Sequence, residues 1–440
     1  MQFDELNTDV IIIGGGLSGL ATATMLARKG QSVRLFEQAH AVGGRARTKE
    51  QDGFYLNLGP HALYRSGPGM RVLTELGIEP RGRVPSVSGA YAVRRGVKHT
   101  FPAGLVSMLT TSLFGLSAKL EAARFLASLP KIAAAKVNGV SVREWLDSNL
   151  SDPVVKEFLM AVFRVSTYTN APDLMSAGAA IEQLQMAFDK SVLYLDGGWQ
   201  TLVEGLTRAA TDAGAIIETG AKIETVERGA AGAVRAVRLA DGRRFECSTV
   251  VIAASPHIAT ELLEDGRQSS LARWSDEMIP VKAACLDVLL KYLPKPKATF
   301  ALGIDRPLYL SVHSATAELA PEGCALIHVA KYLPPDHSES PTDDRRELET
   351  LLDLVQPGWR EAVVSSRLLP DMIVTNALAA ATLEGIKRRP APEVHDVPGL
   401  FIVGDWVGPE GMLADASLAS ARRAAEAITG KQAATVAASA

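Results

Sequence analysis

The sequence predicts an α/β fold. A Rossmann-like nucleotide-binding domain is assembled from three chain segments and joined to an α+β substrate domain that has a mixed sheet with helices. A strand, a glycine-rich turn, a helix and a second strand follow one another in residues 9–37, and similar fragments return near residues 201–256 and 399–428. Two long inserts separate these fragments. We therefore expect the nucleotide-binding domain over residues 1–65, 191–260 and 391–430, the substrate domain over 66–190 and 261–390, and a disordered tail over 431–440.

The composition excludes several classes of protein. The chain has 440 residues, of which 47% are apolar and 22% charged, as in ordinary globular proteins. Its 46 basic and 49 acidic residues give a net charge of −3, so no nucleic-acid partner is expected. Cys247, Cys285 and Cys324 lie far apart without a CxxC spacing. We therefore expect neither a disulfide framework nor a metal site, and a reducing cytoplasm fits this pattern.

One apolar segment leaves a question about membranes open. The first residues, MQFDELNTD, are polar and predict no signal peptide, and no apolar run reaches the ~18 residues that span a bilayer. Residues 101–129 are apolar, with Lys119, Glu121 and Arg124 as interruptions. Two buried helices are the simpler interpretation, and a surface that dips into a membrane interface is the alternative. We expect a cytoplasmic protein, with peripheral membrane contact as the alternative; the sequence does not indicate its oligomeric state.

The first fragment carries a glycine pattern typical of phosphate binding. Gly14, Gly16 and Gly19 form G-x-G-x-x-G between a buried-strand pattern, residues 9–13, and a helical pattern, residues 17–29. The first glycine allows a tight turn, the second lets the backbone approach a pyrophosphate, and the third lets helix and strand pack closely. The helix N-terminus then faces the phosphates. The expected contacts are Gly14, Gly16, Leu17, Ser18 and Gly19.

An acidic residue and a second glycine pair narrow the nucleotide class. Glu37 ends the second strand, 18 residues after Gly19, where a carboxylate accepts from both ribose hydroxyls and repels a 2′-phosphate. Gly43, Gly44 and Arg45 follow about one turn later, and Arg45 offers a guanidinium to a diphosphate. A nicotinamide-dependent dehydrogenase, the competing class at this point, has no need of this second loop.

With these residues the sequence resembles the flavin-containing amine oxidase superfamily, which includes monoamine oxidases, protoporphyrinogen oxidase and phytoene desaturase. The resemblance implies a FAD-binding domain and extends to DGGWQTLVEGL, residues 196–206, and GAKIETVE, residues 220–227. By this match the backbone of Ile223 holds the adenine. The strand VVIAASP, residues 250–256, returns to the dinucleotide at Ala254.

The last fragment, GLFIVGDWVGPEGMLADASLASARRAA, resembles the segment that closes the same superfamily's flavin site. The match implies that Asp405 accepts a ribitol hydroxyl and that Gly404 gives it room. Gly411, Met412 and Leu413 then begin a helix that points its N–H groups at the pyrimidine end of the flavin. A helix N-terminus stabilises the negative charge of a reduced flavin there by ~1–2 kcal/mol.

The departures from the superfamily shape the expected chemistry. The Ser-Gly-Gly-Cys-Tyr segment of monoamine oxidases is missing, because residues 403–407 read VGDWV, so the FAD should be non-covalent. No lysine clearly matches the one that contacts flavin N5 through water; Lys282 lies in a strand-like region and is better interpreted as solvated or satisfied. Paired tyrosines for an amine are also missing from the C-terminal segment. These absences disfavour amines as substrates.

Candidate catalytic residues come from two segments. LNLGPHALYR, residues 56–65, falls where the superfamily places chain beside the flavin ring, and Gly59, Pro60 and His61 resemble a G-P-H of some phytoene desaturase-like members. His61 is a proton acceptor or flavin-edge contact, or else a structural histidine. Arg164 and Tyr168 are four apart at the end of an apolar helix, where they either line the substrate cavity or tie the domains together.

The favoured function is a FAD-dependent oxidoreductase, a desaturase or dehydrogenase that takes a hydride from a C–H bond of a hydrophobic organic substrate. A flavin is itself the electron sink, so such chemistry needs few catalytic side chains. A flavin amine oxidase is the second choice. A non-redox binding protein of the GDP dissociation inhibitor type is a further alternative. The electron acceptor, whether oxygen, a quinone or a protein, stays open.

Overall fold

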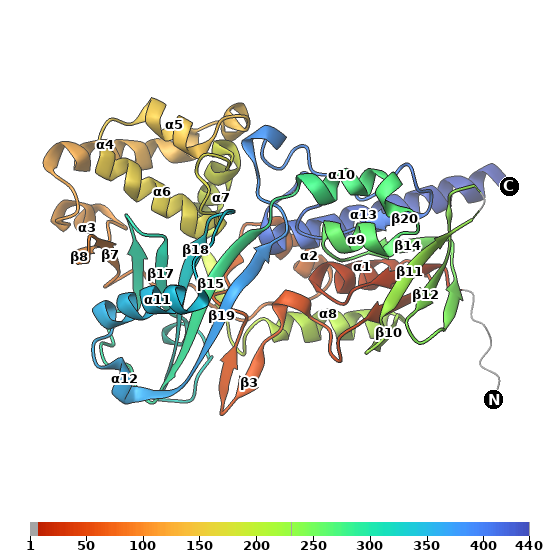
Figure 1. Cartoon of the computed structure of the whole chain (residues 1–440), viewed down its shortest axis with the longest axis horizontal. Coiled ribbons are helices and arrows are strands. Elements are labelled where there is room, and N and C mark those ends of the chain that lie inside the picture. The colour runs from red at the N-terminus through yellow and green to blue at the C-terminus, as the bar shows by residue number, and fades with distance from the viewer. Residues whose placement is uncertain (1–7, 230, 440) are drawn as a thin grey trace.

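The computed structural model describes residues 8–229 and 231–439, which form two parts that lie side by side (Figure 1). The first part contains a five-stranded sheet of order β10-β2-β1-β14-β20 in which all neighbouring strands are parallel. Its strands are β1 (Val10–Ile13), β2 (Val33–Glu37), β10 (Ile216–Thr219), β14 (Thr249–Ile252) and β20 (Leu400–Ile402). Strands from three distant stretches of the chain thus meet in one sheet, as in a Rossmann-like fold.

The two faces of this sheet are covered differently, which explains its continuous apolar strands. Val10 and Ile12 of β1 pack towards helices α1, α8 and α13, whereas Ile11 and Ile13 pack towards a three-stranded sheet and two helices. The helices of the first face are α1 (Leu17–Arg28), α2 (Pro68–Glu75), α8 (Gln200–Asp212) and α13 (Leu413–Ser439). The other face carries β11 (Ile223–Arg228), β12 (Val234–Leu239), β13 (Arg244–Glu246), α9 (Pro256–Leu262) and α10 (Ser270–Glu277).

The second part is built on a seven-stranded mixed sheet of order β19-β15-β18-β17-β16-β7-β8. Only β16 and β7 pair in parallel among these strands, and the other neighbours are antiparallel. The strands are β7 (Tyr91–Arg94), β8 (Val97–Thr100), β15 (Val281–Leu290), β16 (Phe300–Gly303), β17 (Leu308–Val312), β18 (Ala325–Leu333) and β19 (Val363–Thr375). The predicted mixed sheet with helices is confirmed.

Helices cover both faces of the mixed sheet. A helical unit packs on one face through an apolar core that includes Phe158, Tyr309 and Tyr332. It consists of α3 (Leu105–Thr110), α4 (Leu116–Ser128), α5 (Val142–Asn149), α6 (Pro153–Thr167) and α7 (Ala177–Lys190). Helices α11 (Pro341–Val355) and α12 (Trp359–Ala362) close the other face. Among the described residues, no helix combines the length and apolar character needed to cross a bilayer.

Short strands complete the connection between the two parts. A two-stranded ribbon pairs β3 (Lys49–Gln51) with β4 (Phe54–Leu56). A small sheet of order β5-β9-β6 joins β5 (Leu63–Tyr64), β6 (Gly82–Arg83) and β9 (Val192–Leu195). Helix α2 falls in the range predicted for the substrate domain, yet it packs with α1 and α13 in the core of the nucleotide-binding part.

Two local expectations differ from the structure. Arg164 and Tyr168 do not share a helix face, because α6 ends at Thr167 and Tyr168 adopts a left-handed conformation (φ 59°). Helix α13 continues to Ser439, where a disordered tail is expected. The tail is rich in alanine, the strongest helix former, which explains the helix; residue 440 lies outside the described residues.

Candidate functional site

The first glycine turn leaves open space at the N-terminus of α1. An added Cβ at Gly14 (φ 105°) would lie 2.6 Å from the Ala253 carbonyl oxygen, and one at Gly19 would lie 2.0 Å from the Gly14 carbonyl oxygen, so both positions exclude side chains. A Cβ at Gly16 would meet no described atom within 4 Å. No described side chain caps α1, and its first turn, which contains Leu17 and Ser18, has no acid. An anion therefore fits against this helix end.

Glu37 fastens the first turn to the end of β2. Its Oε2 accepts a hydrogen bond from the Gly15 N–H at 2.7 Å, and its Oε1 accepts one from the Ala39 N–H at 2.8 Å. A carboxylate has about four acceptor positions, so these two bonds leave lone pairs for ribose hydroxyls. The side chain is thus oriented before any ligand binds.

The second glycine pair lies directly against the first turn. Gly16 and Gly43 form a β-bridge, and the Gly43 N–H donates to the Gly15 carbonyl at 2.7 Å. Gly43 (φ 118°) and Gly44 (φ 52°) both have positive φ values, and a Cβ at Gly44 would lie 3.5 Å from the Gly16 Cα. The sequence placed these two loops in separate motifs, and the structure brings them together.

Arg45 and Asp405 form an ion pair across the site. The Arg45 Nη1 lies 2.7 Å from the Asp405 Oδ2 and 2.9 Å from the Val374 carbonyl oxygen. Asp405 is buried, and Asn376 donates to it through both its backbone N–H at 3.1 Å and its Nδ2 at 2.9 Å. Burial opposes ionisation of Asp405, but Arg45 and these hydrogen bonds hold its pKa below the usual value. No sequence motif indicated Asn376.

Other residues predicted beside the cofactor lie near this pair. Gly404 (φ 153°) precedes Asp405, and its added Cβ would meet the Trp406 Nε1 at 3.1 Å. The same Trp406 Nε1 donates to the Ala254 carbonyl at 2.9 Å, so that carbonyl is engaged inside the protein. Ile223 is buried at the first residue of β11.

Helix α13 begins at Leu413 with a buried acid in its first turn. Gly411 (φ 73°) and Leu413 (φ 57°) have positive φ values, and Met412 is buried between them. Asp415 Oδ1 accepts from the Gly69 N–H at 2.8 Å, and Oδ2 has no hydrogen-bond partner among the described residues. Burial raises the pKa of Asp415 to about 7.

His61 joins the Gly59–His61 loop to the arginine loop. Its Nδ1 lies 3.1 Å from the Gly59 carbonyl oxygen and its Nε2 lies 3.2 Å from the Arg45 carbonyl oxygen, while its ring packs edge-on against Trp199. Burial lowers the pKa of His61. A neutral imidazole donates one of these two bonds. These contacts place the His61 ring at the junction of the two loops, and both interpretations of this residue stay predictions.

The two other predicted catalytic residues are separated. The Tyr168 hydroxyl donates to the Pro60 carbonyl at 3.1 Å, so it contacts the same loop as His61, and burial raises its pKa. The Arg164 Nη1 donates to the Arg306 carbonyl at 3.3 Å instead, and burial lowers the pKa of Arg164 to about 10. Tyr168 therefore belongs to the candidate site by contact, whereas Arg164 ties α6 to the mixed sheet.

Comparison with known proteins decides which family this site belongs to. The model of the flavin containing amine oxidoreductase family matches residues 17–291, more than half of the chain. The chain belongs to this family. Membership implies a flavin cofactor, which agrees with the glycine turns and with the open space at α1.

Individual relatives cover several activities. A 15-cis-phytoene desaturase of Solanum lycopersicum is 25% identical over 70% of this chain and 56% of its own length. Protoporphyrinogen oxidase 2 of Arabidopsis thaliana is 29% identical over 38% of this chain and 34% of its own length. The chain thus spans between a third and somewhat over half of these relatives. A putrescine oxidase variant has the same fold, with a TM-score of 0.76 at 17% identity over 97% of this chain and 99% of its own.

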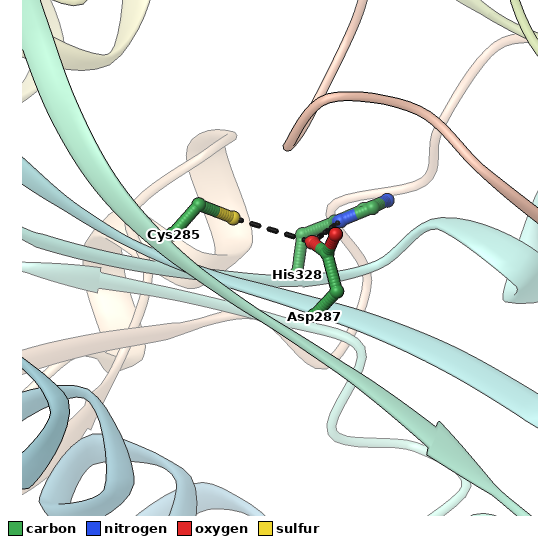
Figure 2. A group of neighbouring side chains, drawn as sticks. All are labelled: Cys285, Asp287 and His328. Carbon is green, nitrogen blue, oxygen red and sulfur yellow. Dashed lines mark hydrogen bonds and ion pairs between the residues drawn. The ribbon is translucent and has the colours of Figure 1, made fainter. Parts of the chain in front are cut away.

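In this family member, a buried polar row crosses the mixed sheet behind the Gly59–His61 loop. Asp287 on β15 is paired in register with His328 on β18 and with Arg367 on β19. Figure 2 shows the Asp287 Oδ1 accepting from the His328 Nδ1 at 2.6 Å and from the Cys285 Sγ at 3.3 Å. Arg367 binds the Asp287 Oδ2, with its Nε at 3.1 Å, and also donates to the Asn57 carbonyl.

This row is an ion-pair network by its geometry. The ligand atoms of Cys285, Asp287 and His328 lie within 4.8 Å of one another, a spacing that a metal ion could also use. Arg367, however, already neutralises the carboxylate, and burial holds the pKa of the Cys285 thiol well above its usual value. A thiolate and a free carboxylate are what a metal requires. Burial opposes ionisation of Asp287, but His328 and Arg367 hold its pKa below the usual value.

Of two cavities among the described residues, only one is lined by predicted site residues. One of about 420 Å³ is lined by Gly411 and Met412 together with Ser66, Gln183, Met186 and Ile386. It therefore opens beside the start of α13. A larger cavity of about 1000 Å³ lies along α8, with Arg28, Arg81, Asp196 and Glu204 in its lining. The larger one contains none of the predicted site residues.

Proposed function

We propose that this protein is an oxidoreductase that binds FAD non-covalently and takes a hydride from a C–H bond of a hydrophobic organic substrate. The observation that carries the proposal is the cradle at the N-terminus of α1. There Gly16 and Gly43 are bridged, Glu37 holds the turn through two N–H groups, and open space faces Gly16. When bound, the flavin would supply the electron sink.

The chain's own residues support a dinucleotide. Gly14–Gly19 and Gly43–Arg45 would hold the diphosphate, Glu37 the ribose, and Asp405 the ribitol. Arg45 lies beside Asp405, and its side chain is still 43% exposed. FAD carries an adenosine ribose for Glu37 and a ribitol for Asp405, whereas a flavin mononucleotide has no ribose for Glu37.

Non-covalent binding is supported by the chemistry of the nearest cysteine. An added Cβ at Gly59 would lie 3.4 Å from the Cys285 Sγ, so this thiol touches the loop of His61. Burial raises the pKa of the Cys285 thiol, and the thiol donates to Asp287. A thiol that stays protonated is a poor nucleophile. No cysteine occurs in VGDWV, residues 403–407.

Two observations support an apolar substrate: the apolar side chains of the helical unit and the ion pair that engages Lys282. The core between the helical unit and the mixed sheet consists of aliphatic and aromatic side chains, which suits a hydrophobic ligand. The Lys282 Nζ lies 3.0 Å from the Asp371 Oδ2, so this lysine is satisfied by an ion pair. A flavin amine oxidase remains the second candidate, favoured by the fold shared with putrescine oxidase.

Two measurements test the proposal in sequence. The visible absorption spectrum of the purified protein should contain flavin bands, and acid precipitation should release FAD into the supernatant. A colourless protein that binds no added FAD contradicts the flavin proposal and favours the binding-protein alternative. Yellow colour that stays in the pellet contradicts only the non-covalent part.

The substrate class needs a separate experiment. The oxidised protein is mixed anaerobically with a polyene and, in a parallel sample, with putrescine, while the flavin absorbance is recorded. Bleaching by the polyene supports a hydrophobic substrate. Rapid bleaching by the amine overturns that part of the proposal. Repeating the assay with oxygen or a quinone then identifies the electron acceptor.

A further inference from the structure

Helices α3 and α4 lie at the outer end of the helical unit (Figure 1). Both helices expose large aliphatic side chains. Their exposed fractions range from 53% for Leu120 to 79% for Leu116. We call these residues the aliphatic patch: Leu105, Val106 and Leu109 on α3, and Leu116 and Leu120 on α4. A water-facing helix surface normally carries polar residues, so this patch requires an explanation.

Helix α4 is apolar on two sides. One stripe, Ala118, Ala122 and Phe125, is buried against α6 and α5 in the core of the helical unit. The other stripe, Leu116, Leu120, Ala123 and Ala127, follows the same helical spacing and is exposed. The simpler interpretation of the sequence was two buried helices, but α4 is buried along one stripe only. The inner stripe accounts for the folding of α4, while the outer stripe has no partner among the described residues.

Among the charged residues on α4 and directly after it, the basic residues outnumber the acidic ones. The Lys119 Nζ donates to the Leu109 carbonyl at 2.6 Å and thereby ties α4 to the end of α3. Both carboxylate oxygens of Glu121 are engaged inside the protein, where they accept from the Ser151 and Asp152 N–H groups at 2.7 and 2.9 Å. Arg124, Lys131 and Lys136 are exposed. The exposed charged residues on α4 and in the segment directly after it are therefore positive, although the whole chain carries −3.

The residue types favour a lipid surface over a protein partner. Protein interfaces concentrate their binding energy in aromatic and arginine anchors. The exposed large apolar side chains of α3 and α4, both fully described, are leucine and valine only, and none is aromatic. Aliphatic side chains beside lysine and arginine are what an interfacial helix presents to acyl chains and anionic head groups.

We propose that α3 and α4 dock this protein on the surface of an anionic lipid bilayer. The aliphatic patch enters the boundary of the acyl chains, and Arg124, Lys131 and Lys136 lie at the head groups. The proposal does not depend on the reaction that the protein catalyses. It describes a contact on the surface of the bilayer, consistent with the lack of a spanning helix among the described residues.

Co-sedimentation with vesicles tests this contact on the full chain in its flavin-bound form. Binding is expected to be stronger to vesicles of phosphatidylcholine with phosphatidylglycerol than to phosphatidylcholine alone, and to weaken with salt. The variant Leu105→Ser/Leu109→Ser/Leu116→Ser should partition at least ~tenfold more weakly. Lys131→Glu/Lys136→Glu should abolish the preference for anionic vesicles and keep the weak binding to neutral ones.

Control variants and a second readout keep the test decisive. Ile216→Ser and Tyr292→Ser remove exposed apolar side chains elsewhere, at 47% and 51% exposure, and should leave vesicle binding unchanged. The variant Leu109→Trp should gain blue-shifted fluorescence only with anionic vesicles. Unshifted fluorescence, or equal binding by the triple-serine variant and the wild type, overturns the proposal. Self-association in analytical ultracentrifugation that the triple-serine variant loses overturns it in favour of a second copy on the patch.

Discussion

Glu37 shows how one side chain can prepare a site before a ligand arrives. Its two oxygens each accept a backbone N–H, one from the glycine turn and one from the residues after β2. A carboxylate fixed in this way loses little conformational freedom when ribose hydroxyls bind. The side chain also joins β2 to the turn that faces the phosphates. Glu37 is thus a structural residue of the turn, and in the proposed function it is also a binding residue.

We expect graded losses of FAD affinity at this position. Glu37→Gln keeps one acceptor oxygen and should weaken FAD binding about tenfold, whereas Glu37→Ala loses both contacts and should weaken it by about a hundredfold or more. Quenching of flavin fluorescence during titration of the flavin-free protein measures both dissociation constants. Arg34→Gln is the control, because Arg34 lies on the same strand β2 and makes none of the predicted cofactor contacts. This variant should bind FAD as the wild type does. Equal affinities for all variants would contradict the assigned contact.

Asp415 makes stability depend on pH through a single buried carboxyl. Burial raises its pKa from 3.8 to about 7 in the folded chain. Between these values the unfolded chain has released a proton that the folded chain keeps. The protonated Asp415 carboxyl therefore contributes fully to the stability of the folded chain below about pH 4, and this contribution is lost as the pH rises through about 7.

Asp415→Asn should remove this dependence. Asparagine keeps an acceptor for the Gly69 N–H and carries no charge. Relative to the wild type, the free energy of unfolding of the variant should increase with pH between 4 and 7, by up to about 4 kcal/mol. Urea denaturation at several pH values across this range measures the difference. Parallel stability profiles for the two proteins would show that Asp415 does not titrate in this interval.

At the residue scale, the residues that could be predicted are those whose backbone conformation or close neighbours restrict the residue type. Gly14, Gly19 and Gly43 could be predicted because their conformations or neighbours exclude side chains. Asn376 could not, because its contact with Asp405 depends on how the end of β19 meets the loop after β20. His61 was predicted as a site residue, but its position between the carbonyl oxygens of Gly59 and Arg45 depends on the relative placement of two loops.

At the scale of elements, the row on β18, β15 and β19 couples three strands by charge. His328, Asp287 and Arg367 are neighbours in register, and the Asp287 side chain is fully buried. Arg367 extends the row to the Asn57 carbonyl and thus to the chain that leads to His61. The mixed sheet and the cofactor-binding loops are therefore joined through this carboxylate.

Removing the charge at the centre of the row should destabilise the protein strongly. Asp287→Asn leaves Arg367 and His328 without their anion and should cost about 3 kcal/mol of unfolding free energy. Asp371→Asn is a matched control, because Asp371 pairs with Lys282 across the same two strands but is 61% exposed. The control should cost less than about 1 kcal/mol. Thermal and urea denaturation compare the two, and similar losses would contradict the role of burial.

Single helices and strands could be predicted from the sequence more readily than the pairing of one strand with another. The strands β1, β2 and β14 of the parallel sheet were predicted from short apolar runs, and α1 was predicted from its spacing and its glycine turn. The buried row escaped prediction, because its members lie 41 and 80 positions apart and meet only through strand register. Cys285 and His328 taken singly look like ordinary strand residues. Register, which depends on the assembled sheet, is not encoded in any one segment.

At the scale of the whole molecule, the flavin should stabilise the part that is built on the parallel sheet. The loops of residues 14–19 and 43–45 lie near the start of the chain and residues 404–413 lie near its end, and a ligand that contacts all three adds its binding energy to folding. At a free FAD concentration 100 times the dissociation constant, this contribution is about 2.7 kcal/mol. Removal of the flavin should therefore lower the melting temperature, and added FAD should restore it. Thermal denaturation followed by circular dichroism at increasing FAD concentrations measures this effect, and an unchanged melting temperature would contradict it.

The place of β20 in the parallel sheet has a consequence for synthesis on the ribosome. β14 pairs with β1 on one side and with β20, residues 400–402, on the other, and α13 packs beside α1. The helical unit is contiguous from α3 to α7 and emerges early, whereas the sheet that holds the nucleotide gains its last strand only after residue 402 has left the exit tunnel. A nascent chain must therefore keep β1 and β14 protected from aggregation until residue 402 has emerged. A flavin that contacts residues 404–413 would be held fully only after this point.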